Sequence, residues 1–122
     1  MMQIGNACTL VAYSKRQAFL VSWNHDNDET IGIQDETFKF DNERFAVAVR
    51  INDSVIPGNL TGAGNGNMLT VPVKPIDALL PSVTEVEVKL ANSRTDSEVT
   101  VPVNTRMPPL LTAAARCRSE LR

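Results

Sequence analysis

Cysteine, histidine and aromatic residues are all scarce in this chain. Its 122 residues include two cysteines, one histidine, one tryptophan and one tyrosine, and aromatic side chains make up 5% of the total. A structural zinc ion usually needs four Cys or His ligands, which two distant cysteines and a single histidine do not supply. The paired-cysteine motif of redox proteins is absent as well. We therefore expect neither a metal ion nor any other cofactor.

The chain also lacks an excess of charge of one sign and a long apolar run. Its net charge is -2, whereas a nucleic-acid-binding protein needs a basic surface. No stretch of about 18 apolar residues is present to span a membrane. The hydrophobic content of 43% is too high for a disordered chain, and the length fits one domain over residues 1–122. We expect a folded domain that neither binds nucleic acid nor spans a membrane.

Common catalytic motifs are missing too. Neither the G-x-S-x-G pattern of hydrolases nor the H-E-x-x-H pattern of zinc proteases occurs. The glycine-rich segment from Gly62 to Asn67 is similar in composition to phosphate-binding loops, but those loops begin a helix and a strand pattern follows here. Asn65-Gly66 is instead typical of the central pair of a hairpin turn. The sequence therefore favours a protein that is not an enzyme.

Alternating apolar residues indicate short strands in the first half of the chain. Strand patterns cover residues 9–13 and 18–23 around a polar turn, which predicts a hairpin, and a shorter pattern covers 30–33. The clearest alternation places Phe45, Val47, Val49 and Ile51 on one face of a strand. These segments predict antiparallel β-structure.

The second half contains an internal repeat. Thr70-Val71-Pro72-Val73 recurs as Thr100-Val101-Pro102-Val103, and each copy ends a predicted hairpin, over 55–62 with 68–73 and over 86–90 with 98–103. A short helical pattern follows each hairpin, at 75–80 and 108–117. Two ββα units in tandem explain this arrangement, and chance recurrence of four residues is the alternative. Because proline lacks an N–H, Pro72 and Pro102 belong at a sheet edge, at a bulge or where the nitrogen faces solvent.

The fold class that follows is mainly β. We expect an antiparallel barrel or sandwich of about seven or eight short strands, with two short helices that cover exposed edges or an open end.

The two cysteines occupy positions from which they are able to meet. Leu110, Ala114, Cys117 and Leu121 form one apolar stripe on the last helix, and Cys8 shares its strand face with Leu10 and Ala12. A disulfide between Cys8 and Cys117 forms if that helix packs across the first strand. Two independent buried thiols are the alternative.

The cellular compartment that we expect depends on whether Cys8 and Cys117 form a disulfide. A disulfide implies an oxidising compartment, so the protein is periplasmic or secreted, whereas free thiols suit the cytoplasm. The first residues, Met1-Met2-Gln3-Ile4, lack the charged and apolar regions of a signal peptide.

Tyr13, Trp23 and His25 are the candidate ligand-binding residues. His25 lies in the polar run Asn24-His25-Asp26-Asn27-Asp28-Glu29, which is typical of a turn between strands. A histidine beside carboxylates is also a candidate general base. The same run lacks the twelve-residue spacing and central glycine of a calcium loop. We assign no catalytic residue and no metal ligand.

The order of these features resembles a known family. Cys8 in the opening strand is followed by short strands, by Asp77-Ala78-Leu79-Leu80, by a further hairpin and by Leu110-Leu111-Thr112-Ala113-Ala114-Ala115-Arg116-Cys117. This order is similar to small exported bacterial domains of the invasion-associated locus B-like family and to related secreted proteins. The resemblance implies a periplasmic β-rich domain with its terminal helix tied to the first strand, and it implies no catalytic residues.

Three functions remain from these observations. We expect first a non-catalytic accessory or binding module of the cell envelope that contacts a protein partner through its surface. The second is a small ligand-binding protein or hydrolase with a site inside the barrel, at Tyr13, Trp23 and His25. The third is an inhibitor of a cell-envelope enzyme that inserts the Gly62–Asn67 hairpin tip into its target.

Overall fold

The computed structural model describes residues 2–4, 7–26 and 28–120, which form one antiparallel sheet with a C-terminal helix. The strand order is β1-β2-β3-β4-β8-β7-β5-β9-β10, and the short β6 pairs with β5. The strands are β1 (Met2–Ile4), β2 (Ala7–Ser14), β3 (Gln17–Asn24), β4 (Glu29–Asp35), β5 (Arg44–Ile51), β6 (Ser54–Val55), β7 (Leu60–Asn65), β8 (Met68–Val73), β9 (Glu85–Ala91) and β10 (Asp96–Pro102). A 3-10 helix η1 covers Leu80–Ser82, and α1 covers Met107–Glu120.

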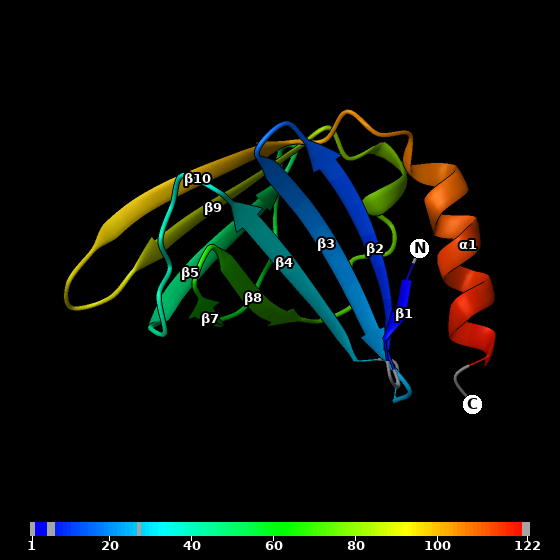
Figure 1. The fold of residues 1–122 in the computed structure, drawn as a ribbon, viewed down its shortest axis with the longest axis horizontal. Helices are drawn as coiled ribbons and strands as arrows, with labels where there is room; N and C mark the ends of the chain where they lie inside the picture. The colour runs from blue at the N-terminus through cyan, green and yellow to red at the C-terminus, as the bar shows by residue number, and fades with distance from the viewer. Residues whose placement is uncertain (1, 5–6, 27, 121–122) are drawn as a thin grey trace.

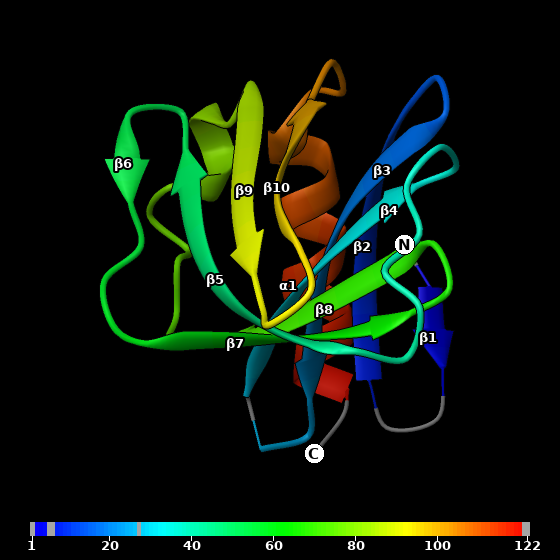
Figure 2. The same cartoon turned by 90° about the vertical axis from the view of Figure 1, so that its left-hand side faces the viewer.

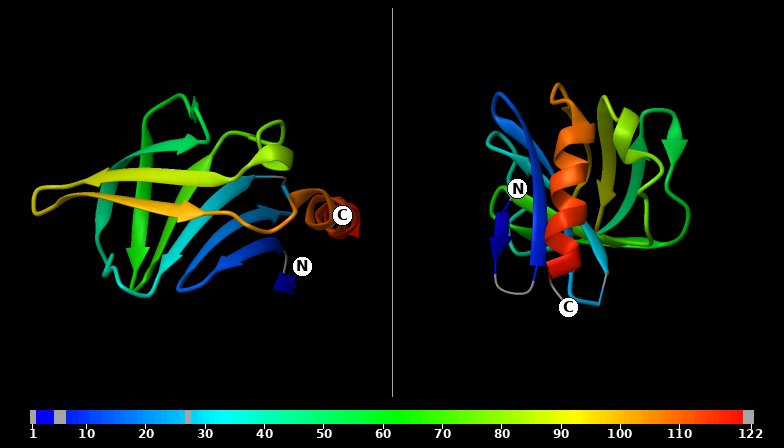
Figure 3. Two further views of the ribbon diagram at one scale, coloured as in Figure 1. Left: turned by 90° about the horizontal axis from the view of Figure 1, so that it is seen from above. Right: turned by 90° about the vertical axis from the view of Figure 1, so that its right-hand side faces the viewer.

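The sheet curls into an open half-barrel (Figure 1). Figure 2 shows β7 and β8 crossing between one half of the sheet, made of β2, β3 and β4, and the other half, made of β5, β9 and β10. Helix α1 stands over the open side, where it packs on β2 and η1 (Figure 3). The expected mainly antiparallel β fold is therefore confirmed, with a barrel that is open.

Alternation along the strands builds the core. Phe45, Val47, Val49 and Ile51 are buried on β5 while the residues between them are exposed, as the sequence predicts. Phe19, Val21 and Trp23 do the same on β3. Each large apolar side chain removed from water stabilises the fold by about 1.5–3 kcal/mol before chain entropy is counted. One contiguous core therefore fills the inside of the half-barrel.

The prediction of a short helix over residues 75–80, the first of the two expected helices, is wrong. Residues 77–79 form a turn that leads into the 3-10 helix η1 at Leu80, and α1 is the one α-helix in the described residues. Pro75 and Pro81 enclose too few residues for an α-helix, because a helix needs several turns to offset its costly first turn. The second ββα unit is present as expected, whereas the first ends in η1.

Two details of the hairpin predicted over residues 55–62 and 68–73 also differ from the structure. Val55 does not begin its first arm, because Val55 lies in β6 and pairs with Arg50 of β5. The arms are β7 and β8, and Asn65 pairs with Met68. The central turn residues are therefore Gly66 and Asn67 and not Asn65-Gly66. Gly66 takes φ 62°, which suits the first central position of a tight hairpin turn.

The repeated prolines lie where their missing N–H is tolerated. Pro102 ends β10, the last strand in the sheet order. Pro72 pairs with Thr30 of β4 but lies past the ladder between β8 and β7, which covers Met68 to Thr70. Both prolines are exposed, as a position at a sheet edge or beyond a ladder requires.

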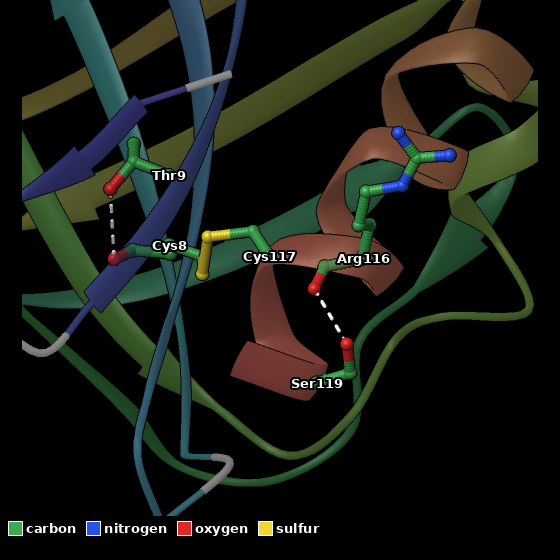
Figure 4. Close-up of a disulfide and its surroundings, with 6 residues drawn as sticks. Cys8, Thr9, Arg116, Cys117 and Ser119 are labelled. Atoms are coloured by element: carbon green, nitrogen blue, oxygen red, sulfur yellow. Dashed lines mark hydrogen bonds between the residues drawn. A yellow bond between two sulfur atoms is a disulfide. The ribbon is translucent and has the colours of Figure 1, made fainter. Parts of the chain in front are cut away.

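Cys8 and Cys117 form a disulfide, so the alternative of independent thiols is wrong. Their Cα atoms lie 6.1 Å apart, and their sequence separation is 109. Figure 4 shows Cys8 directed from β2 toward α1, with Thr9 on the opposite face of the strand. Ala114 and Cys117 of the expected apolar stripe are buried and Leu110 is partly buried. Leu121 lies outside the described residues.

Candidate functional site

The three candidate ligand residues do not converge on one site. Tyr13 is 69% exposed near the hairpin end of β2, where it pairs with Ala18. Trp23 lies near the other end of the same hairpin, where it pairs with Cys8 and is 1% exposed. His25 follows β3 in a turn, and its Nε2 lies 3.4 Å from Oδ1 of the neighbouring Asp26. A ligand-binding role for these residues stays a prediction.

Trp23 instead belongs to a polar cluster where β3, β4, the loop of residues 74–79 and α1 meet. Its indole Nε1 donates a hydrogen bond of 2.7 Å to Oε1 of Glu29, the first residue of β4. The backbone N–H of Ile76 donates a second bond of 2.7 Å to Oε2. Glu29 is 3% exposed. Both of its oxygens are therefore held by neighbours in the fold.

A second carboxylate touches Glu29. The side chain of Asp77 is in hydrogen-bond contact with the Glu29 carboxyl group. Burial, together with this contact and the negative charge of Asp77, raises the pKa of Glu29 to about 7, although the bonds from Ile76 and Trp23 act to lower it. The pair is therefore able to hold a shared proton close to neutral pH.

Arg118 connects the cluster to α1. Its Nη1 lies 3.8 Å from Oδ2 of Asp77, and its guanidinium carbon lies 4.8 Å from the centre of the Trp23 ring. Arg118 follows Cys117, so the disulfide fixes this part of the helix beside Trp23. We call Trp23, Glu29, Ile76, Asp77 and Arg118 the mouth cluster.

The sequence pattern predicts that Glu29 ends a polar turn, so this cluster is not apparent from the sequence. One signal was available. Glu29 has the same strand parity as Ile31 and Ile33, so a strand that begins one residue earlier places its carboxylate on the buried face. No sequence spacing indicates the contacts with Asp77 or Arg118, because both depend on how the chain folds back over the sheet.

A second feature is a face of the sheet that carries no charge. The outward positions of β2, β3, β4 and β8 form three cross-strand rows, since each residue lies opposite its partner in the register. The rows are Thr9, Ser22, Thr30 and Pro72; Val11, Leu20, Gly32 and Thr70; and Tyr13, Ala18, Gln34 and Met68. We call these twelve residues the neutral face.

A hollow of about 180 Å³ lies in the middle of the neutral face. Gly32 keeps it open, because a Cβ at this position would lie 3.3 Å from Cβ of Leu20 and 3.5 Å from Sδ of Met68. Hydroxyl groups surround it, and those of Thr9 and Ser22 lie 3.2 Å apart in a hydrogen bond. The hollow therefore offers apolar contact with hydroxyl groups at its rim.

The other half of the sheet has a different outer surface. There Arg50 lies opposite Glu87 and forms an ion pair with it at 2.7 Å. Lys89 lies between Ala48 of β5 and Glu98 of β10. Charged residues make up 21% of the chain, so their absence from all twelve positions of the neutral face distinguishes this face from the rest.

No metal centre or membrane helix is present in the part of the chain that the structure describes. Among those residues, His, Cys, Asp and Glu side chains nowhere gather in groups of three or more that are able to hold a metal ion. No helix among them has the length and apolar character needed to cross a membrane.

Comparison of the chain with protein-family models, with curated protein sequences and with solved structures finds no significant match.

Proposed function

We propose that this protein is a non-catalytic binding module of the cell envelope that contacts a protein partner through the neutral face. The observation that carries the proposal is the set of twelve aligned positions without a charged side chain, in which Ala18 and Gly32 are buried between their exposed or partly exposed neighbours. Charged residues are depleted and tyrosine is enriched in the centre of protein interfaces, and Tyr13 on this face is 69% exposed.

The size of the hollow supports a protein partner over a free small molecule. Ligand pockets usually enclose about 300–1,000 Å³. The hollow at Gly32 measures about 180 Å³ and is bounded by the surface of the sheet. Such a hollow suits one apolar side chain of a partner, with hydrogen bonds from the surrounding Thr and Ser hydroxyls.

The disulfide supports a location outside the cytoplasm. Disulfides persist in oxidising compartments and are rare in the cytosol. We therefore propose a periplasmic or secreted protein, on the basis of the Cys8–Cys117 bond.

The internal repeat provides a matched pair of variants to test this function. Thr70 lies on the neutral face and Thr100 lies on β10, and both are exposed in the same local sequence Thr-Val-Pro-Val. Thr70→Lys adds a charge to the neutral face, whereas Thr100→Lys adds the same charge to the other half of the sheet. We expect Thr70→Lys to lose a partner that the wild type and Thr100→Lys both retain.

The measurement is quantitative capture from an envelope extract by the three proteins, followed by titration of the captured partner. Circular dichroism confirms that both variants fold. Equal capture by Thr70→Lys and wild type, capture of no partner at all, or turnover of a substrate in a broad screen would each contradict the proposal.

A further inference from the structure

The mouth cluster joins four separate parts of the chain through two carboxyl groups. Glu29 lies on β4 and receives hydrogen bonds from Trp23 of β3 and from the backbone of Ile76. Asp77 lies in the loop of residues 74–79 between β8 and η1, and its side chain is 53% exposed. Asp77 therefore meets solvent on one side and a buried carboxyl group on the other.

Helix α1 has few other anchors near this end. Met107, Ala114 and Cys117 are its buried residues in the described part of the chain. Beyond the disulfide, Arg118 bridges to Asp77 and stacks on Trp23. A movement of Asp77 therefore changes the noncovalent support of α1 at Arg118, whereas the disulfide still links Cys117 to β2.

We propose that Glu29 and Asp77 form a pH-sensitive latch, in which one shared proton holds the loop of residues 74–79 and the C-terminal part of α1 against the sheet. In the closed state the protonated carboxyl of Glu29 donates a hydrogen bond to the carboxylate of Asp77. Release of that proton to solvent leaves two adjacent carboxylates, and their repulsion displaces Asp77, which is the more exposed partner. The latch then loosens.

Three charged residues lie near the carboxyl pair, namely Arg118, Lys74 and Asp28. Arg118 on α1 pairs with Asp77, so a positive charge lies beside the carboxylate that accepts the shared hydrogen bond. Lys74 follows Val73, the β8 residue paired with Glu29, and is exposed. Asp28 precedes Glu29 and accepts a hydrogen bond from Asn24. The pKa of Glu29, raised to about 7, places the release of the proton near neutral pH.

His25 and Asp26 are the other titratable groups near Trp23 in the sequence. They face each other at 3.4 Å on the exposed turn after β3. Because His25 lies two residues after Trp23 in the sequence, it needs its own control in any experiment that follows Trp23 fluorescence against pH.

Trp23 is the sole tryptophan and its N–H binds Glu29, so its fluorescence reports on the latch directly. We expect the emission of the oxidised wild-type protein to change between pH 5 and pH 8.5 with a midpoint near 7. Over the same interval, hydrogen exchange in residues 74–79 and in the last two turns of α1 should rise by about tenfold after correction for intrinsic rates.

Two variants test the carboxyl pair, and a third controls for histidine. Asp77→Asn removes the adjacent charge from a half-exposed site, so the midpoint should fall by about one pH unit or more. Glu29→Gln should abolish the transition. His25→Gln should titrate like the wild type.

The latch is wrong if wild-type fluorescence and local exchange do not change across this interval, or if His25→Gln removes the transition. It is also wrong if Asp77→Asn leaves the midpoint in place, a result that does not require Glu29→Gln to fold. None of these outcomes affects the proposed binding role of the neutral face, which the lysine variants test separately.

Discussion

At the scale of single residues, strand β4 carries two acidic side chains whose pKa values shift in opposite directions. Glu29 and Asp35 lie at the two ends of β4 and both side chains are buried. The pKa of Glu29 is raised, first by burial and then by Asp77. Burial also acts to raise the pKa of Asp35, but hydrogen bonds from Thr37 and Gln17 outweigh it, so the pKa of Asp35 is lowered. The hydrogen-bond partners and neighbouring charges of each carboxyl group therefore decide whether its pKa is raised or lowered.

These opposite shifts predict that stability is greatest at mildly acidic pH. A raised pKa at Glu29 contributes stability that is complete below the unfolded value of 4.5 and is lost as pH rises through about 7. This loss amounts to about 3 kcal/mol at most. A lowered pKa at Asp35 contributes stability above 3.8 that is lost as the pH falls through its folded pKa. Urea unfolding from pH 3 to pH 8.5 measures both limbs of the curve.

Glu29→Gln separates the two contributions. In this variant the free energy of unfolding should no longer fall as the pH rises toward 7, whereas its fall at acidic pH should persist. A wild-type free energy of unfolding that is constant or rises from pH 5 to pH 8 would show that Glu29 ionises freely in the folded protein.

Gly64 is the glycine whose replacement we expect to cost most. A Cβ at Gly64 would lie 2.5 Å from the carbonyl oxygen of Phe40 and 2.8 Å from that of Asp41. Both are backbone atoms, so the loop must move to make room. Gly64→Ala should therefore lower the free energy of unfolding by about 1–3 kcal/mol in a denaturant titration.

Gly32→Ala is the matched control, because its new Cβ would meet side-chain atoms of Leu20 and Met68 at 3.3 Å and beyond. Equal destabilisation by the two alanines would contradict the close backbone approach at Gly64.

At the scale of elements, α1 depends on its covalent link. In the described residues it buries three side chains over fourteen residues, which is a narrow apolar contact. The disulfide closes a loop with a sequence separation of 109, for which the chain-entropy model gives roughly 4–5 kcal/mol. We expect the double variant Cys8→Ser, Cys117→Ser to lose stability on this scale and to exchange its α1 amides faster than its sheet amides.

Thermal unfolding and hydrogen exchange with and without reductant measure both effects. Retention of wild-type protection in α1 after reduction would show that noncovalent packing is enough to hold the helix.

The strands were predictable from sequence where the pattern is local. Alternation in Phe45–Ile51 specifies β5, and the shared parity of Cys8 with the buried Leu10 indicates which way the cysteine points. The segment at 75–80 has the composition of a short helix, but Pro81 and the approach of Ile76 to Glu29 favour turns. Local propensity fails there because a contact with a distant strand decides the conformation.

The candidate sites were less predictable, for the same physical reason. The neutral face becomes visible only once the register aligns β2, β3, β4 and β8, since β8 is far from β4 in sequence. Asp77 and Arg118 give no local pattern that connects them with Glu29. Residue type alone groups Tyr13 with Trp23, but the hairpin separates them onto opposite faces and ends.

At the scale of the whole molecule, side chains tie the two halves of the half-barrel together. Gln17, at the start of β3, donates from Nε2 to Oδ2 of Asp35 at 2.8 Å and to the backbone oxygen of Thr100 at 2.9 Å. Asn104, which follows β10, donates to the hydroxyl of Ser14 at 3.2 Å. The last strand is thereby held against the β2–β3 hairpin although no ladder joins them in the strand order.

Gln17→Ala should therefore open this end of the half-barrel. Loss of the two bonds should lower the free energy of unfolding by about 1–3 kcal/mol, because Asp35 keeps its bonds from Thr37 while the Thr100 carbonyl loses its partner from β3. Freed from Gln17, the edge of β10 is a template for pairing with another chain, so light scattering on mild heating should rise with protein concentration. Gln17→Glu is the control: its carboxylate accepts but does not donate, so it should destabilise at least as much as alanine at neutral pH and recover as it is protonated. Wild-type stability and scattering in both variants would show that the sheet's curvature alone holds β10 in place.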